Sequence, residues 1–290
     1  MDINSLRSVP TVMLMPMSLI LMMCGSALQS EIISDKDWTL VWSDEFNGEN
    51  LDMTKWSYQT GTGSAYGLPA GWGNNELQFY TQRRDNVFIK DSRLYIRANR
   101  EEFKGHAYTS ARIRTALKGD WLYGKFEISA KLPKGQGIWP AIWMLPTEDT
   151  YGSWAASGEI DIVELIGQSP ATIHGSICHG GPWPRNKSKT VSYSLNPGDF
   201  SRKFYRFTLI WEPQQISWYV DDVLYACQSE WSCENADYPA PFDQKFYLLL
   251  NVAVGGNWPK APDETTQFPV QMEVEYVKVF QRTSTLNQNQ

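Results

Sequence analysis

The segment Gly158-Glu159-Ile160-Asp161-Ile162-Val163-Glu164-Leu165-Ile166-Gly167 sets three acids inside an apolar, β-branched run. Branched apolar residues favour a β-strand, whereas acids are poor strand formers and repel one another on a shared face. A local rule broken in this way is typical of a functional site. The spacing alone is a weak signal, because a chain with 32 acids in 290 residues can match it by chance. A half-exposed strand with a polar outer face would explain it equally well.

The parity of the three acids makes a geometric prediction. Side chains alternate along a strand, so Glu159 and Asp161 share one face while the isoleucines between them point into the core. Glu164 has the wrong parity to join them. One extra residue at 162–163, a β-bulge, would turn its side chain to the same face. We therefore predict a bulge and three carboxylates in one groove.

Carboxyl groups arranged in this way fit the chemistry of glycoside hydrolysis. One glutamate must be ionised to attack the anomeric carbon, and the other must carry a proton for the leaving oxygen. Asp161 between them can separate their two pKa values through its charge and hydrogen bonds. A separation of roughly 5–5.5 Å between the two carboxyl groups gives retention of configuration, and a wider one gives inversion.

Strand signals dominate the rest of the chain, without a long stretch of helical periodicity or an internal repeat. The pattern predicts an all-β protein, a β-jelly-roll sandwich of two antiparallel sheets with a concave substrate cleft, in one domain. Asp221-Asp222 reads as a hairpin turn, and the polar tail 283–290 as frayed. The strands are expected over residues 39–46, 86–98, 123–132, 138–145, 159–166, 205–211, 216–225, 246–252 and 272–280.

The chain contains 13 Trp, and several lie in segments rich in Gly and Pro. A flat apolar ring with a polar handle suits a sugar, which presents C–H surfaces and hydroxyls together. Each ring could equally fill the core, so both interpretations stay open for Trp72, Trp139, Trp154, Trp183 and Trp258.

The N-terminal segment has the pattern of a secretory signal peptide over residues 1–27, with an apolar run from Val12 to Cys24 and cleavage expected after Ala27. The run is too short and interrupted for a spanning helix. Residues 28–290 then form the catalytic domain, with a core at about 38–281. The net charge of −6 argues against nucleic acid or an anionic membrane as a partner. We expect a secreted, extracellular protein.

Three cysteines remain after the leader. In an oxidising compartment Cys227 and Cys233 are expected to form a disulfide that closes a small loop. Cys178 then stays unpaired as a buried small hydrophobe. His174 and His179 flank it, but no second cluster completes a zinc site. Asn186-Lys187-Ser188 is a glycosylation sequon with Asn186 as acceptor.

Several segments together resemble glycoside hydrolase family 16, and within it the endo-β-1,3-glucanases, or laminarinases. The resemblance covers about residues 38–281, and the acidic segment matches the signature in its bulged form. The other matching segments are Trp42-Ser43-Asp44-Glu45-Phe46-Asn47-Gly48, Gly71-Trp72-Gly73-Asn74-Asn75-Glu76-Leu77-Gln78 and Trp139-Pro140-Ala141-Ile142-Trp143-Met144-Leu145.

The resemblance implies hydrolysis of laminarin-like β-1,3-glucans with retention, and mixed β-1,3-1,4-glucans as secondary substrates. Glu159 would be the nucleophile, Asp161 the residue that assists it, and Glu164 the general acid and then base. No cofactor is required for this chemistry. The positions that match the lining of the family's cleft are Asn74, Arg112, Trp139, Trp143 and Trp258.

The resemblance also implies a structural calcium ion, held by Glu45, the Gly48 carbonyl and Glu275, where Asp is more usual. The segment 177–181 departs from the family pattern, which leaves the role of His179 open. Two alternatives to a hydrolase remain: a non-catalytic β-1,3-glucan recognition protein, which lacks the catalytic glutamates, and a transglycosylase. In each case the partner is a β-glucan polysaccharide and the protein is expected to be a monomer.

Overall fold

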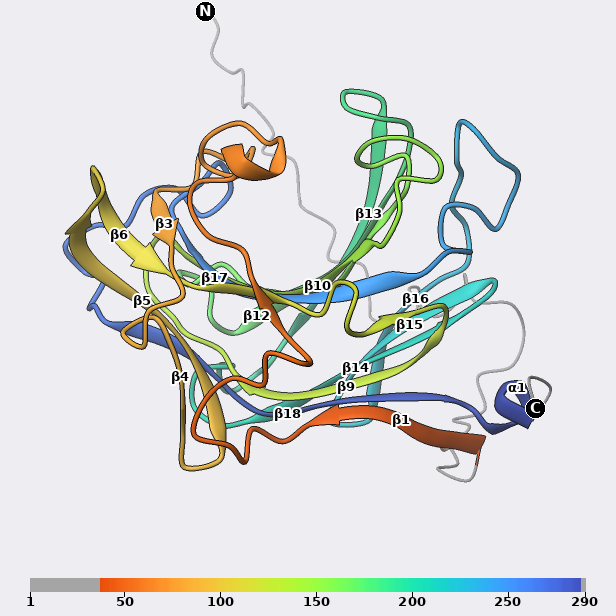
Figure 1. Ribbon diagram of the computed structural model, residues 1–290, viewed down its shortest axis with the longest axis horizontal. Coiled ribbons are helices and arrows are strands. Elements are labelled where there is room, and N and C mark those ends of the chain that lie inside the picture. Colours follow the sequence, from red (N-terminus) through yellow and green to blue (C-terminus); the bar gives the residue numbers. More distant parts are fainter. Residues whose placement is uncertain (1–36, 288–290) are drawn as a thin grey trace, which may run out of the picture. The chain divides into compact units, whose positions relative to one another are not determined.

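Two β-sheets lie face to face in the computed structural model, which describes residues 37–287 (Figure 1). The predicted signal peptide lies outside these residues and stays a prediction. Strands β10 and β17 belong to one layer and strands β9, β14 and β18 to the other. Among the described residues, no helix is long and apolar enough to cross a membrane.

The larger sheet has ten strands, all antiparallel to their neighbours except β3 and β6, which are parallel. Strand β1 pairs with β18 and β4 with β5 at the side of the main order. The order is β16 (Val223–Gln228), β15 (Gln215–Val220), β14 (Tyr205–Glu212), β9 (Gly124–Lys131), β18 (Val270–Arg282), β5 (Arg93–Phe103), β6 (His106–Ser110) and β3 (Gln78–Tyr80), with β1 (Trp38–Asp44) and β4 (Val87–Lys90) alongside.

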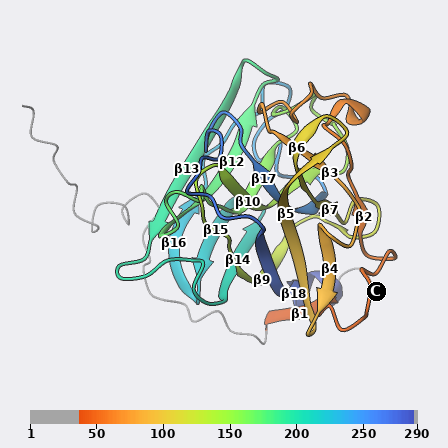
Figure 2. The same cartoon turned by 90° about the vertical axis from the view of Figure 1, so that its left-hand side faces the viewer.

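The smaller sheet has eight strands and carries the acidic segment. Its strands β13, β12, β10 and β17 follow one another across Figure 2 in the order of the ladder. The order is β13 (Asn186–Ser194), β12 (Thr172–Gly180), β11 (Glu159–Glu164), β10 (Ile138–Pro146), β17 (Phe246–Val254), β7 (Arg112–Arg114) and β2 (Ser57–Tyr58), with β8 (Asp120–Trp121) on β17.

The core between the sheets is formed by the inward faces of both. Every residue of β17 is buried, as expected for a strand covered on both faces. Three fully buried tryptophans, Trp56, Trp211 and Trp218, add large apolar surfaces. Each indole N–H has an acceptor: the Asp44 carboxylate for Trp56 at 2.8 Å, and backbone carbonyls for the other two. The buried polar groups of these rings are therefore satisfied.

Most predicted strands are present, with ends shifted by a few residues. The predicted turn at Asp221-Asp222 is confirmed: φ is 45° and 70°, the left-handed pair that a tight hairpin needs. A second such turn, at Asp91-Ser92 with φ of 51° at both residues, divides the predicted strand 86–98 into β4 and β5. The tail also differs from expectation, because residues Thr283–Asn287 form the short helix α1. A 3-10 turn, η3, lies at Ser64–Tyr66.

The hairpin of β12 and β13 was absent from the predicted strands. Gly175 and Gly180 interrupt the apolar pattern of β12. In β13 most residues are polar, including several Ser and Lys, and only Val191 and Tyr193 turn to the core. Two apolar residues are too few to reveal the alternation of a strand. Tertiary pairing overrides these weak local signals. The hairpin matters because β12 lies directly beside the acids.

Candidate active site

The predicted β-bulge is confirmed in β11. Against β10, Ile142 pairs with Val163 and Trp143 pairs with Asp161, which leaves Ile162 as the extra residue. Against β12, the register also shifts between Asp161 and Glu164. A bulge of this kind re-aims the following side chain by one parity step.

The bulge places all three acids on the outer face of the smaller sheet. On β12, Glu159 lies opposite Cys178, Asp161 opposite Ser176 and Glu164 opposite His174, and these three partners share one parity. The inward face of the same strands carries Ile160, paired with Ile177, and both are buried. We call this outer face, with its three acids and their ladder partners, the acid face.

A hydrogen bond from the other sheet supports the bulge. Trp218 on β15 donates its indole N–H to the backbone carbonyl of Asp161 at 2.8 Å. Gly175 on β12 leaves room for this ring, because a Cβ there would lie 2.7 Å from Trp218 Cδ1 and 2.8 Å from its Nε1. The close approach therefore requires glycine at position 175.

Glu159 lies where donors support its charged form. Trp154 donates its indole N–H to Glu159 Oε2 at 2.9 Å. Burial raises the pKa of Glu159, while the hydrogen bonds of Trp154 and Cys178 and the charge of Arg112 lower it. The pKa remains above the usual range, but these neighbours stabilise the carboxylate. This residue is suited to be the ionised member of a pair.

Glu164 lies where its protonated form is favoured. Burial and the charge of Glu159 raise its pKa to about 7, against a hydrogen bond from the Trp139 indole N–H to Oε1 at 2.9 Å. Trp139 in turn contacts Trp258 edge to face, with ring centroids 5.6 Å apart. Trp258 also contacts the His174 ring at 4.9 Å. A carboxyl group with this pKa can hold a proton near neutral pH and give it up in a reaction.

Asp161 is the most enclosed of the acids, with 4% of its surface exposed. Burial, and then the charges of Glu164 and Glu159, raise its pKa well above the usual range. Its carboxyl group has no hydrogen-bond donor among the described residues. A proton held on Asp161 reduces the repulsion between the two glutamates.

Arg112 is the cation that influences the acid face from the β7 side. It is 5% exposed, and its guanidinium carbon lies 4.4 Å from the Trp72 ring and 4.7 Å from the Trp143 ring. Gln59 accepts from its Nε at 2.6 Å. The Trp143 indole N–H donates to Asn251 at 2.8 Å. These contacts fix the positive charge and two aromatic rings in one rigid unit.

Asn74 lies in an exposed loop at the same side, and its amide donates to Glu76 at 3.3 Å. Glu76 also accepts from Gln78 at 2.6 Å and from the Tyr80 hydroxyl at 3.3 Å. Burial raises the pKa of Glu76, against the charge of Arg112. Sequence reasoning did not single out Glu76 for a role. Its place within the Asn74-Asn75-Glu76 motif, two residues from the matched Asn74, was the available signal.

Four of the five tryptophans that were open between core and surface divide clearly, and the fifth, Trp139, is half-buried beside Glu164. Trp72 is 4% exposed and belongs with the buried rings, whereas Trp154, Trp258 and Trp183 are 39%, 37% and 73% exposed. The backbone N–H of Trp183 donates to the Trp154 carbonyl at 3.0 Å, so these two loops are joined. Exposed rings therefore stand at both ends of the acid row, Trp154 at Glu159 and Trp258 beyond Glu164.

The predicted disulfide between Cys227 and Cys233 is wrong, because both are thiols in the structure. Cys227 lies in β16, where the ladder sets it opposite Ser217. Cys233 lies in a segment that pairs with Gly180, and its thiol donates to the Ala156 carbonyl at 3.6 Å. The two cysteines are thus held by different neighbours. Cys178 is also a buried thiol, as expected, but it lies on the acid face.

His179 points away from the acids, because it has the parity of the core-facing residues of β12. It is 3% exposed, and its Nδ1 lies 3.1 Å from the Ser232 carbonyl oxygen. The residue therefore takes no part in the acid face. Asn186, the predicted glycosylation site, is the half-buried first residue of β13, and its modification stays a prediction.

The carboxylates implied for calcium are engaged by the chain's own cations. Glu45 forms an ion pair with Lys278 at 3.0 Å, and Glu275 accepts from the Ser129 hydroxyl at 2.7 Å and pairs with Arg93 at 3.4 Å. A calcium ion needs such oxygens as its own ligands, so it would have to displace these partners. Calcium binding stays a prediction.

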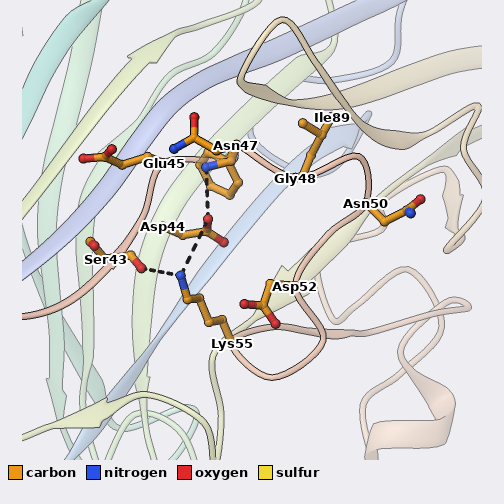
Figure 3. Close-up of a pocket in the computed structure, with 10 residues that line it drawn as sticks. Ser43, Asp44, Glu45, Asn47, Gly48, Asn50, Asp52, Lys55 and Ile89 are labelled. Carbon is orange, nitrogen blue, oxygen red and sulfur yellow. Dashed lines mark hydrogen bonds and ion pairs between the residues drawn. The ribbon is translucent and has the colours of Figure 1, made fainter.

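A pocket of about 530 Å³ lies beside Glu45 and Gly48, lined also by Asp44 and Asp52 (Figure 3). Lys55 enters it, donating to the Ser43 carbonyl at 2.7 Å and lying 3.9 Å from the Asp44 carboxylate. The pocket contains none of the acids of β11. It is therefore separate from the acid face.

A β-sandwich that carries two carboxyl groups of different proton affinity on one face, flanked by indole rings, has the arrangement of a glycoside hydrolase. Comparisons with known proteins agree. The family model of the glycosyl hydrolases family 16 matches residues 74–278. The chain belongs to this family and is a glycoside hydrolase, and the predicted β-jelly-roll sandwich is confirmed.

Two relatives and one solved structure illustrate the similarity. The chain is 41% identical over 263 residues to glucan endo-1,3-beta-glucosidase A1 of Niallia circulans, covering 83% of this chain and 37% of that protein. It is 42% identical over 257 residues to the glucan endo-1,3-beta-glucosidase of Cryptopygus antarcticus, covering 83% and 91%. The catalytic domain of an endo-1,3-beta-glucanase (laminarinase) from Thermotoga petrophila RKU-1 matches with a TM-score of 0.76 and 42% identity, covering 85% of this chain and 99% of that chain.

The cross-sheet hydrogen bond leads to a first prediction. Trp218→Phe removes the donor to the Asp161 carbonyl and should lower the free energy of unfolding by about 1–3 kcal/mol, the cost of an unsatisfied buried acceptor. Because the bulge loses its support, the rate of reducing-sugar release should fall as well. Trp211→Phe is the matched control: it also loses a buried indole donor, to Phe242 at 3.2 Å, but should keep the rate. Equal rates for both variants would contradict the role assigned to Trp218.

The raised pKa of Glu164 leads to a second prediction. Its folded-state pKa of about 7 lies above the ordinary value of 4.5, so the folded state disfavours the charge that is present above pH 7. Glu164→Gln should therefore stabilise the protein by about 1–3 kcal/mol at pH 8 and leave it nearly unchanged at pH 4, where the carboxyl is neutral in the folded state and mostly neutral in the unfolded state. Urea denaturation at the two pH values measures this.

Asp52→Asn provides the control of opposite sign. The hydroxyl of Thr54 lowers the pKa of Asp52, so this charge favours the folded state and its removal should destabilise the protein at pH 8. If Glu164→Gln and the wild type were equally stable at pH 8, the crowding of the acids would carry no energetic cost.

Proposed function

We propose that this chain is an endo-β-1,3-glucanase that cleaves laminarin-like β-1,3-glucans within the polysaccharide. The observation that carries the proposal is the pair of glutamates on the acid face, of which Glu159 is supported as an ion and Glu164 as an acid. The similarity to relatives named as glucan endo-1,3-beta-glucosidases supports the linkage. Mixed β-1,3-1,4-glucans are included as secondary substrates.

The proposed mechanism proceeds with retention of configuration. Glu159 attacks the anomeric carbon, while Glu164 gives its proton to the leaving glycosidic oxygen. Glu164, now ionised, takes a proton from water, and that water releases the sugar from Glu159. Asp161 carries a proton beside Glu159 and lowers the charge density as the ester forms and breaks. A single carboxyl thus acts first as acid and then as base.

The exposed indole rings support a polysaccharide substrate. Trp154 and Trp258 stand at the two ends of the acid row. Trp154 donates to the Glu159 carboxylate, and Trp258 contacts Trp139, which donates to Glu164. A sugar stacked on either ring would lie against the acids. Trp143 is a half-buried ring next to Asp161 in the ladder of β10 and β11, and the buried Arg112 packs against it and fixes its position.

We also propose that the protein is secreted and acts as a monomer. The apolar run from Val12 to Cys24 supports secretion into the extracellular medium. A soluble monomer acting on an external polysaccharide requires no cofactor, nucleic acid or membrane partner.

A polysaccharide panel tests the proposed substrate. The protein should release reducing sugar from laminarin and curdlan, less from lichenan, and none from xyloglucan or agarose. Glu159→Gln and Glu164→Gln should each lower the laminarin rate by several orders of magnitude, because each removes one required proton or charge role. Glu45→Gln, outside the acid face, should keep the rate. Binding of laminarin by the wild type without sugar release would identify a recognition protein instead.

The stereochemical prediction is tested by proton NMR of the first products. Retention requires that the new reducing end appears as the β-anomer and converts to the α-anomer only by mutarotation. First appearance of the α-anomer would establish inversion and remove Glu159 from the role of nucleophile. Mass spectrometry of the same samples at high substrate concentration distinguishes a transglycosylase, which would give mainly elongated products.

A further inference from the structure

The thiol of Cys178 occupies a place on the acid face that the proposed mechanism does not use. The ladder sets Cys178 directly opposite Glu159, so the two side chains point to the same side of the sheet. Only 8% of Cys178 is exposed. One carboxylate oxygen of Glu159, one of Asp161 and the Cys178 sulfur all lie within 4.8 Å of one another.

The surroundings of this group supply one counter-charge, that of Arg112, which acts on Glu159. Asp161, 4% exposed, directs a carboxyl group into the cluster without a hydrogen-bond donor among the described residues. The thiol has only the Ser188 hydroxyl, 3.3 Å away, and its interaction with Glu159. Burial and the charges of Glu159 and Asp161 raise the pKa of Cys178, so the sulfur carries its proton when nothing else is bound.

We propose that Glu159, Asp161 and Cys178 form a binding site for one thiophilic divalent cation, of the Zn²⁺ or Cd²⁺ class, and that the bound cation blocks the enzyme. Two carboxylate oxygens and one sulfur supply three ligands, and a water on the open side supplies a fourth, the usual number for such ions. On binding, the Cys178 thiol and the Asp161 carboxyl each release a proton to solvent, and a metal–sulfur and a metal–oxygen bond form with no change of oxidation state.

The cation compensates the charge that crowding otherwise leaves on the acids. It also occupies the Glu159 oxygen that would attack the anomeric carbon, so metal and substrate exclude each other. A sulfur ligand selects against hard cations: Mg²⁺ and Ca²⁺ prefer six or more oxygens and gain nothing from the thiol. The site is therefore inhibitory and selective, unlike a patch of acids alone.

The experiment separates binding from activity, because only the inhibition rests on the proposed function. The full chain with Cys24→Ser, Cys227→Ser and Cys233→Ser keeps Cys178 as its single cysteine. Titration with Cd²⁺ should give the ultraviolet charge-transfer band of a cadmium–thiolate bond, with release of protons from Cys178 and Asp161, and Mg²⁺ should give neither. Absence of the band at millimolar Cd²⁺ would refute the site, whether or not the protein hydrolyses laminarin.

Two ligand variants then test whether the site is the whole cluster or a single thiol. Asp161→Asn keeps the thiol and the side-chain shape, yet should weaken Cd²⁺ binding by about tenfold or more. Cys178→Ser should raise the Cd²⁺ concentration for half-inhibition of laminarin hydrolysis by at least the same factor, each variant being compared with its own metal-free rate. Cys227→Ser and Cys233→Ser should leave that concentration unchanged. Tight binding retained in Asp161→Asn, or inhibition retained in Cys178→Ser, would overturn the proposal.

Discussion

The active site depends on one hydrogen bond between the two sheets, from the Trp218 indole to the backbone carbonyl of Asp161. The bulge at Ile162 is necessary because a regular strand would send Glu164 into the core. A bulge, however, disrupts the ladder and leaves backbone groups to be satisfied elsewhere. The indole of the opposite sheet satisfies this carbonyl, and Gly175 leaves the space for the ring. Packing and catalytic geometry are therefore set by the same contact.

The second constraint is electrostatic, and it opposes folding. Three carboxyl groups share one half-buried face, and burial raises the pKa of each. Such crowding costs stability, which the apolar core around β17 and the buried indoles offsets. The two glutamates have different neighbours. Trp154, Cys178 and Arg112 lower the pKa of Glu159 and so favour its charged form. At Glu164 only the hydrogen bond from Trp139 opposes the rise in pKa. Identical side chains thereby acquire different proton affinities.

The placement of the three acids on one face could be predicted from the sequence, because it depends on the alternation of side chains along a strand. The alternation around Glu159 and Asp161 requires a bulge if Glu164 is to join them, and the structure has one at that position. Contacts between distant segments could not be predicted in this way. The disulfide expected from the closeness of Cys227 and Cys233 fails because strand pairing holds each elsewhere. The hairpin of β12 and β13 likewise depends on tertiary pairing, and with it the position of Cys178.

The position of Cys178 shows how the ladder and the charge crowding act together. Residues opposite each other in an antiparallel pair must share a face, so the residue at 178 meets Glu159 whatever its type. Among the described residues, Arg112 is the cation whose charge reaches Glu159. No cation among the described residues lowers the pKa of Asp161 or Glu164, so these two acids are neutralised mainly by protons. The acid face therefore lacks positive charge. This lack favours the proton that Glu164 needs for catalysis, and it would also attract a cation to the site that contains Cys178.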